Sequence, residues 1–160
     1  VCAKAFNEKL NAFVQSYETH IADASTLVIP LVGFLPPEDP RVRGTVAYVE
    51  KCLLRRGLVL RYDSTKTDDG LPAGEGAFLA CSFWLADNYT LMNRADDARA
   101  MFERLLALRN DVGLLSEEYD SDRKRLVGNF PQGFSHIALL STAFNLAHDH
   151  EPTQTPISRI

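Results

Sequence analysis

The sequence predicts an all-α fold, and two observations carry this prediction. Residues 76–93 and 132–148 are apolar nearly all round, a pattern typical of helices that are buried on several sides. Between them, residues 95–108 are amphipathic, with one apolar face formed by Ala98, Met101, Phe102, Leu105 and Leu108. Two concentric rings of helices would require this alternation, because inner helices touch neighbours on all sides and outer helices keep one face in water.

The first third of the chain predicts an extended segment followed by a helix. Residues 6–17 alternate loosely between apolar and polar side chains, which favours an irregular or partly extended conformation. Asp23 is a good N-cap for a helix over 24–35, because its carboxylate can accept hydrogen bonds from the first free backbone N–H groups. Pro30 lies inside this helix and is expected to kink or divide it.

The next helix is expected to begin at Asp39-Pro40, a cap followed by a first-turn proline. Apolar residues at spacings of four and three mark its buried face: Val42, Val46, Val49 and Leu53. Arg55-Arg56-Gly57 is typical of a helix C-terminus, with cations at the negative end of the helix dipole and a glycine past the end. A short strand over 58–62 is expected to follow.

Length, charge and cysteine usage restrict the class of protein. A chain of 160 residues can bury one core, and 17 Lys and Arg residues against 21 Asp and Glu residues give a net charge of −4. Because both signs are interspersed, neither nucleic acid nor a membrane surface is an expected partner, and a neutral polar substrate fits better. No apolar run reaches the roughly 18 residues of a membrane span. Three isolated cysteines favour a reducing compartment, so the predicted location is cytoplasmic.

Two adjacent acids stand in the segment Ser116-Glu117-Glu118-Tyr119-Asp120, which is bracketed by Gly113 and Gly128 and is expected to be a loop. Helical scaffolds commonly present reactive groups on such loops. The segment resembles the Ser-Glu-Gln-Tyr-Asp segment of glycoside hydrolase family 15, the glucoamylases and their bacterial trehalase-like relatives. The resemblance covers nearly the whole chain and is plainest at Asp23-Ala24-Ser25, Phe34-Leu35-Pro36-Pro37, Gly74-Glu75-Gly76-Ala77-Phe78 and Asn129-Phe130-Pro131-Gln132.

The resemblance implies roles for both acids. In this family the first Glu of the segment is the general base that activates water, and that role falls on Glu117. The pattern alone leaves open that Glu117 is a solvated loop acid. Glu118 stands where the family frequently has Gln. It either binds a sugar hydroxyl or pairs with Arg123 or Arg125, and the sequence leaves both open.

A second candidate site is the turn Gly74-Glu75-Gly76. Two glycines around one acid let backbone and carboxylate approach a ligand closely, and the start of a helix favours a negative charge. By resemblance this turn lines the sugar-binding rim, so all three residues are predicted to bind substrate. A plain helix cap is the alternative. Trp84 is predicted to offer a stacking surface to a sugar ring, with burial in the core as the alternative.

No cofactor and no metal site is predicted, because the sequence has neither a phosphate-binding glycine loop nor a zinc-ligand spacing. Ser135 and His136 invite comparison with a nucleophile and its base. Neighbours on a helix point in different directions, however, so His136 is expected to be a hydrogen-bonding residue of the core or rim.

The resemblance also implies an architecture. The catalytic domain of the family is an (α/α)6 toroid of twelve helices, whereas this sequence predicts about five. Residues 1–150 are therefore expected to be the C-terminal portion of a catalytic domain, followed by a polar tail over 151–160. The missing N-terminal half is an expected partner, and apolar helix faces are expected to stay exposed without it.

The implied activity is hydrolysis of α-glucosidic bonds with inversion, in a starch-like oligosaccharide or in trehalose. The family's general acid comes from an upstream motif that has no match here, so this chain alone is expected to be inactive or nearly so. One alternative is a non-catalytic helical module that binds carbohydrate or another partner through a degenerate site. Another is a small complete enzyme in which Glu75 is the acid.

Overall fold

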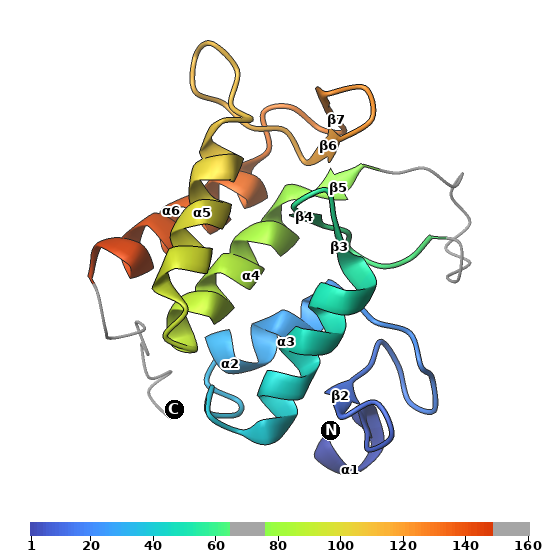
Figure 1. The fold of residues 1–160 in the computed structure, drawn as a ribbon. Helices are drawn as coiled ribbons and strands as arrows, with labels where there is room; N and C mark the ends of the chain where they lie inside the picture. Colours follow the sequence, from blue (N-terminus) through green and yellow to red (C-terminus); the bar gives the residue numbers. More distant parts are fainter. Residues whose placement is uncertain (65–75, 149–160) are drawn as a thin grey trace, which may run out of the picture.

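The structure, a computed structural model, describes residues 1–64 and 76–148. Within these ranges the fold is mostly helical, which confirms the predicted all-α class (Figure 1). None of the described helices is long and apolar enough to cross a membrane. The helices are α1 (Cys2–Ala5), the 3₁₀ helix η1 (Ala24–Leu27), α2 (Val28–Leu31), α3 (Pro40–Leu53), α4 (Leu79–Leu91), α5 (Ala95–Leu106) and α6 (Gly133–Ala147).

Short antiparallel strands connect the helices. The first pair confirms the partly extended segment expected over 6–17, and the last sheet joins parts of the chain that are about forty residues apart. The pairs are β1 (Phe6–Asn7) with β2 (Ala12–Phe13), β3 (Leu54–Arg55) with β4 (Leu58–Val59), and a three-stranded sheet in which β6 (Glu118–Asp120) lies between β5 (Ala77–Phe78) and β7 (Arg125–Val127).

Helix α4 forms the centre of the core. It packs against α5 and α6 on one side and against η1 and α2 on the other (Figure 1). Leu79, Phe83 and Leu85 on this helix are fully buried, which confirms the burial that its apolar circumference predicted. Helix α5 buries Ala98 and Leu105 and turns its charged residues to solvent, as the amphipathic pattern predicted.

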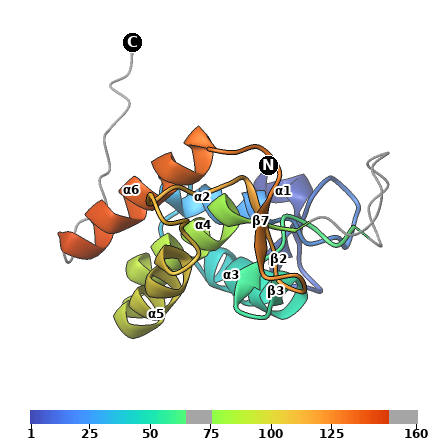
Figure 2. The same ribbon diagram turned by 90° about the horizontal axis from the view of Figure 1, so that it is seen from above.

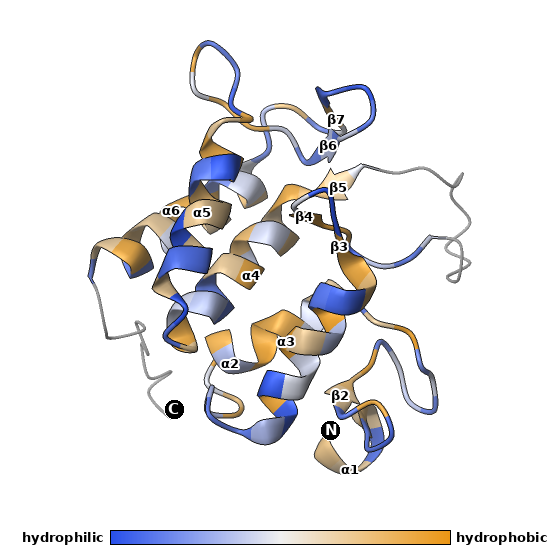
Figure 3. Ribbon diagram, in the orientation of Figure 1, coloured by the Kyte–Doolittle hydropathy of each residue, from blue (hydrophilic) through white to orange (hydrophobic). Residues whose placement is uncertain are grey.

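Helix α6 differs from α4 because it is buried on one side only. It packs on α4 and α5 and lies at the edge of the molecule in both views (Figures 1 and 2). Much of α6 is coloured as hydrophobic in Figure 3, and several of its apolar side chains are exposed: Phe134 (44% exposed), Ile137 (63%), Leu140 (66%) and Phe144 (45%). The prediction of burial on several sides was wrong for α6. The prediction of an exposed apolar helix face is confirmed.

The helix expected over 24–35 is shorter and changes type within its length. Asp23 caps it as predicted, since its Oδ1 accepts a hydrogen bond from the Ser25 N–H at 2.8 Å. The 3₁₀ helix η1 then passes into α2, which contains Pro30 and ends at Leu31. Gly33 adopts the left-handed conformation (φ 70°), and the Phe34 N–H donates back to the Ile29 carbonyl at 3.1 Å. This arrangement is a common helix terminator, which explains the early end.

The Arg55-Arg56-Gly57 prediction was right about a cation at the end of the helix, since Arg55 Nη1 donates to the Lys51 carbonyl at 3.4 Å. It was wrong about the role of the last two residues. Helix α3 ends at Leu53, and Arg56 and Gly57 form the tight turn of the β3–β4 hairpin instead. Both residues have positive φ, 51° and 80°, which is what a two-residue hairpin turn that matches the strand twist requires.

The predicted start of the central helix was also wrong. The helix expected from Gly76 begins at Leu79, because Ala77 and Phe78 pair with β6.

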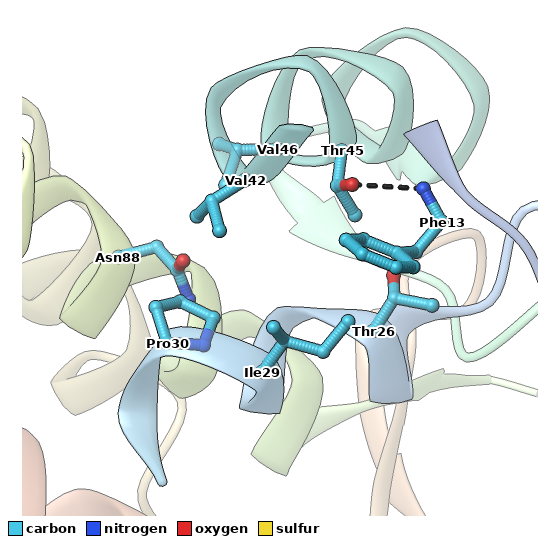
Figure 4. A pocket seen from close by; sticks show the side chains of 8 residues that line it. All are labelled: Phe13, Thr26, Ile29, Pro30, Val42, Thr45, Val46 and Asn88. Atoms are coloured by element: carbon cyan, nitrogen blue, oxygen red, sulfur yellow. Dashed lines mark hydrogen bonds between the residues drawn. The ribbon is translucent and has the colours of Figure 1, made fainter. Parts of the chain in front are cut away.

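Buried hydrogen bonds tie the N-terminal hairpin to α3 and the 3₁₀ helix η1 to α4. Figure 4 shows the side chains that converge there, including Phe13, Thr45 and Asn88. The Phe13 N–H donates to Thr45 Oγ1 at 2.9 Å. Asn88 Nδ2 donates to the carbonyls of Leu27 (2.9 Å) and Trp84 (2.8 Å), while its Oδ1 has no partner among the described residues. Asn88 thus links α4 to η1.

Candidate active site

Glu118–Asp120, the second part of the acid segment, forms strand β6 and not the loop that the sequence predicted. Glu118 lies opposite Phe78 of β5 and opposite Val127 of β7, and Tyr119 lies opposite Ala77. Tyr119 and Leu126 pack against the core, which anchors the sheet to the helices. The sheet therefore holds the two acids beside the start of α4.

Glu117 precedes β6, and its backbone is fixed on both sides. Its N–H donates to the Asn129 carbonyl at 2.9 Å, and its carbonyl accepts from the Leu79 N–H at 3.0 Å. Leu79 is the first residue of α4, where backbone N–H groups lack partners within the helix. Glu117 thus connects the start of the central helix to the loop that leads into α6.

The Glu117 carboxylate is held by that same loop. Its Oε2 accepts hydrogen bonds from the Asn129 N–H at 3.1 Å and from Asn129 Nδ2 at 2.9 Å. Gly128 has a φ of 75°, and a Cβ placed on it would lie 3.0 Å from Glu117 Oε2. Glycine at 128 therefore allows the loop to pass this close to the acid.

A hollow of about 250 Å³ lies beside both acids. Polar groups and apolar carbon surface both face it, a mixture that suits a sugar ring with its hydroxyl groups and C–H faces. The hollow brings together Glu117, Glu118 and Gly76, three of the residues predicted for the site. Gly74 and Glu75 lie outside the described residues. The other described residues that line it are Leu60, Arg61, Tyr62, Ser64 and Phe78.

Glu118 is attached to the strand in front of α4. Its Oε2 accepts a hydrogen bond from the Gly76 N–H at 2.9 Å. A Cβ on Gly76 would lie 2.9 Å from the Tyr119 carbonyl oxygen, so only glycine permits this close approach of the two strands. Arg123, one of the two partners considered for Glu118, pairs with Asp120 at 3.2 Å instead. Backbone N–H donation from Arg123 and the nearby guanidinium lower the pKa of Asp120.

Comparison with known proteins identifies the family. The sequence model of glycosyl hydrolases family 15 matches residues 1–144. The chain belongs to this family. A mostly helical fold with a strand-held acid segment agrees with the part of an (α/α)6-type fold that the resemblance led us to expect from a family 15 protein.

Similar trehalases match most of this chain but only part of their own length. A trehalase of Mycobacterium tuberculosis is 42% identical over 139 residues, which is 87% of this chain and 20% of that protein. A trehalase of Thermoplasma acidophilum is 39% identical over 143 residues, 89% of this chain and 24% of that protein. The chain therefore spans about a fifth to a quarter of the length of these relatives.

A solved wild-type glycosidase has the same fold over the region that the chain covers. It superposes with a TM-score of 0.78 at 22% sequence identity, covering 92% of this chain and 41% of the glycosidase. At this level of identity the likeness concerns the fold alone.

Trp84, the remaining residue predicted for the family 15 site, is not among the described residues that line the hollow. Its ring packs edge to face on the Phe134 ring at 5.7 Å, and the Phe78 ring lies 6.1 Å from the Phe134 ring. Trp84 therefore supports the start of α6, and its contact with substrate stays a prediction.

His136 is a hydrogen-bonding residue of the rim, as the sequence predicted. Nε2 accepts from the Leu115 N–H at 3.3 Å, and Nδ1 lies 2.7 Å from the Gln132 carbonyl, to which it can only donate. Neither of these two hydrogen bonds of His136 involves Ser135. The Ser135 hydroxyl donates instead to the Ser116 carbonyl at 2.8 Å. Both residues fasten the start of α6 to the acid segment.

Sequence reasoning missed two groups of residues at the site. Arg61 and Tyr62 were assigned to a short strand, yet they line the hollow, and the Arg61 guanidinium lies 5.3 Å from the centre of the Tyr62 ring. Asn129 belonged to a motif that carried the resemblance but received no role. A polar–aromatic pair directly after an apolar run was the available signal for the first group.

Among the described residues, no cluster of three or more His, Cys, Asp or Glu side chains is arranged to hold a metal ion.

Proposed function

We propose that this chain supplies the general base and part of the sugar-binding hollow of an inverting α-glucosidic hydrolase, with Glu117 as the base. Family 15 membership supports the reaction class. The single observation that supports the residue is the position of Glu117, which lines the hollow and whose carboxylate is held at Oε2 by hydrogen bonds from Asn129.

In this mechanism the Glu117 carboxylate takes a proton from a water molecule on the face of the sugar opposite to the leaving group. The water oxygen forms a bond to the anomeric carbon while the bond from that carbon to the glycosidic oxygen breaks. The glycosidic oxygen leaves with a proton from the general acid. The two carboxyl groups of an inverting enzyme stand roughly 6.5–9.5 Å apart, which leaves room for the water.

The general acid is proposed to come from a part of the catalytic domain that this chain does not contain. Glu117 and Glu118 are adjacent, and Glu118 is bound to the Gly76 N–H, so the pair does not offer acids on opposite faces of a sugar. Relatives extend well beyond the matched region, since the chain spans only 20% and 24% of two trehalases. Lack of a general acid commonly lowers the rate by about 10²- to 10⁴-fold, so the 160 residues alone should show almost no turnover.

Trehalose is the proposed substrate, and a starch-like oligosaccharide is the second candidate. Matching relatives from Mycobacterium, Thermoplasma and Sulfolobus are all named trehalases, which supports the disaccharide. Arg61, Tyr62 and Glu118 would bind sugar hydroxyls, and Phe78 would face a C–H surface of the ring.

Glucose release from trehalose and from maltose tests the proposal. The assay should use the complete product of the open reading frame that encodes Val1–Ile160, as wild type and as Glu117→Gln, with Glu103→Gln on the exposed face of α5 as the control. Turnover that Glu117→Gln reduces by at least about 10²-fold and the control leaves intact is expected. The anomer first formed from maltose, followed by NMR, should be β. Full activity of Glu117→Gln would refute the assignment, and sugar binding without turnover would favour the non-catalytic module.

A further inference from the structure

In the loop between β7 and α6, Asn129 donates hydrogen bonds to the Glu117 side chain. Two donors of Asn129, the backbone N–H at 3.1 Å and the side-chain Nδ2 at 2.9 Å, bind the same carboxylate oxygen, Oε2. A third hydrogen bond runs the other way, from the Glu117 N–H to the Asn129 carbonyl at 2.9 Å. These three hydrogen bonds join the backbones of Glu117 and Asn129 and also hold the Glu117 carboxylate.

This arrangement makes the two oxygens of Glu117 different. Oε2 has both of its hydrogen bonds on one side of the carboxylate, and within residues 1–64 and 76–148 Oε1 has none. A carboxylate held at one oxygen cannot rotate freely about its terminal bond, since rotation would break both bonds. Oε1 is thereby left as the oxygen that can accept a proton.

The loop itself is anchored independently of Asn129. The Gln132 N–H donates to the Leu115 carbonyl at 3.0 Å, and the Ser135 hydroxyl donates to the Ser116 carbonyl at 2.8 Å. These bonds join the start of α6 to the residues directly before Glu117. Loss of the Asn129 side-chain amide would therefore leave the path of the loop intact and remove one of the two hydrogen bonds that hold the carboxylate.

We propose that Asn129 is a positioning residue for Glu117: it holds Oε2 so that Oε1 faces the attacking water. This inference rests on the proposed function of Glu117 as the base. The positioning role explains why both donors of Asn129 bind the same carboxylate oxygen. It also explains the glycine at 128, because the absence of a Cβ there lets the loop approach the Glu117 carboxylate.

The test measures kcat and KM for trehalose in the complete product of the reading frame, as wild type, Asn129→Ala, Asn129→Asp and Gln132→Ala. Removing the amide should lower kcat by about 10- to 100-fold, because a misplacement on the order of 1 Å is known to cost that much. The KM should change by less than about twofold, since an interaction that acts in the transition state affects kcat. Asn129→Asp places a second carboxylate against Oε2 and should lower kcat further.

Gln132→Ala is the matched control, because Gln132 lies in the same loop and its side chain caps α6 through the Phe134 N–H without touching Glu117. It should keep the wild-type kcat although loss of the cap lowers its unfolding midpoint, and the two Asn129 variants should keep the wild-type unfolding midpoint. An unchanged kcat for Asn129→Ala, in an enzyme that Glu117→Gln inactivates, would overturn the positioning role alone. A kcat loss that follows a loss of folded protein would also overturn it. Full turnover of Glu117→Gln would overturn the proposed function itself.

Discussion

Replacing Asp87 by Asn is expected to stabilise the fold at neutral pH. Asp87 lies on α4 at the contact with α6, and only 5% of its surface is exposed. Asn145 Nδ2 on α6 donates to its Oδ1 at 3.0 Å. Burial raises the pKa of this carboxyl to about 6, and the hydrogen bonds from Asn145 and Thr142 only partly offset the effect. At neutral pH the fold therefore contains a charge that is poorly solvated.

The magnitude follows from the change in pKa. The ordinary value for this carboxyl is 3.8, and the folded value is about 6. Between these values the folded protein binds the proton more tightly than the unfolded chain, so the free energy of unfolding falls as the pH rises. Two pKa units amount to about 3 kcal/mol, lost in full above pH 6 and not lost below pH 4. Asn keeps the acceptor oxygen but adds N–H groups, which cost about 1 kcal/mol if unpaired. The net gain at pH 7 should be about 2 kcal/mol.

Urea unfolding followed by circular dichroism between pH 4 and pH 7.5 measures this effect. The stability of Asp87→Asn should exceed that of wild type at pH 7, and the order should reverse near pH 4. Asp111→Asn, in an exposed loop, is the control and should follow the wild-type curve. A wild-type pH dependence in Asp87→Asn, or a loss of stability at pH 7, would show that the buried charge is not the cause.

Two further substitutions test other features. Asn88→Asp would replace the donor to the Leu27 and Trp84 carbonyls by a buried negative charge, so the free energy of unfolding should fall by more than about 3 kcal/mol. Asn110→Asp, which keeps its two acceptor bonds, should change it by less than about 0.5 kcal/mol, and a small effect of both would contradict the role of Asn88. Leu140→Lys in the exposed face of α6 should reduce self-association in sedimentation velocity, whereas Val112→Lys in a loop should not. Equal association of all three proteins would show that this face is not the interface.

Much of the helical structure could be predicted because its signals are local. The cap at Asp39 is an example: its carboxylate accepts from the Arg41 N–H at 2.9 Å, and Pro40 occupies the first turn. The apolar circumference of α4 and the amphipathic stripe of α5 likewise give their burial directly. The ends of α4, α5 and α6 lie within about three residues of the predicted ends.

The strands could not be predicted because their partners are distant in sequence. Arg55-Arg56-Gly57 has the composition of a helix end and also suits a hairpin turn. The tertiary contacts of β4 favour the hairpin, since the Val59 N–H donates to Ser82 Oγ of α4 at 2.8 Å. The pairing of Phe78 with Glu118 bridges forty residues, and no local pattern encodes such a register.

At the candidate site, the resemblance predicted that Glu117 is the base, and the structure showed which residues surround it. Arg61 and Tyr62 approach the acid segment only because Tyr62 bridges to Asp23 and β4 packs on α4. Nothing in the residues around Glu117 indicates that neighbourhood. The two hydrogen bonds from Asn129 likewise depend on how the loop before α6 crosses the strand, which is a property of the whole fold.

The main chain and the side chain of Glu117 have different roles. The carbonyl accepts a hydrogen bond from the first N–H of α4, whereas the carboxylate is the proposed base. The main chain of this residue caps the central helix, and its side chain takes no part in that bond. A descendant that exchanged the acid for an inert side chain would keep the cap, and with it the buried helix. With Glu117 as the proposed base, folded proteins that have lost turnover should therefore be able to arise by change at 117 with little change elsewhere in the chain.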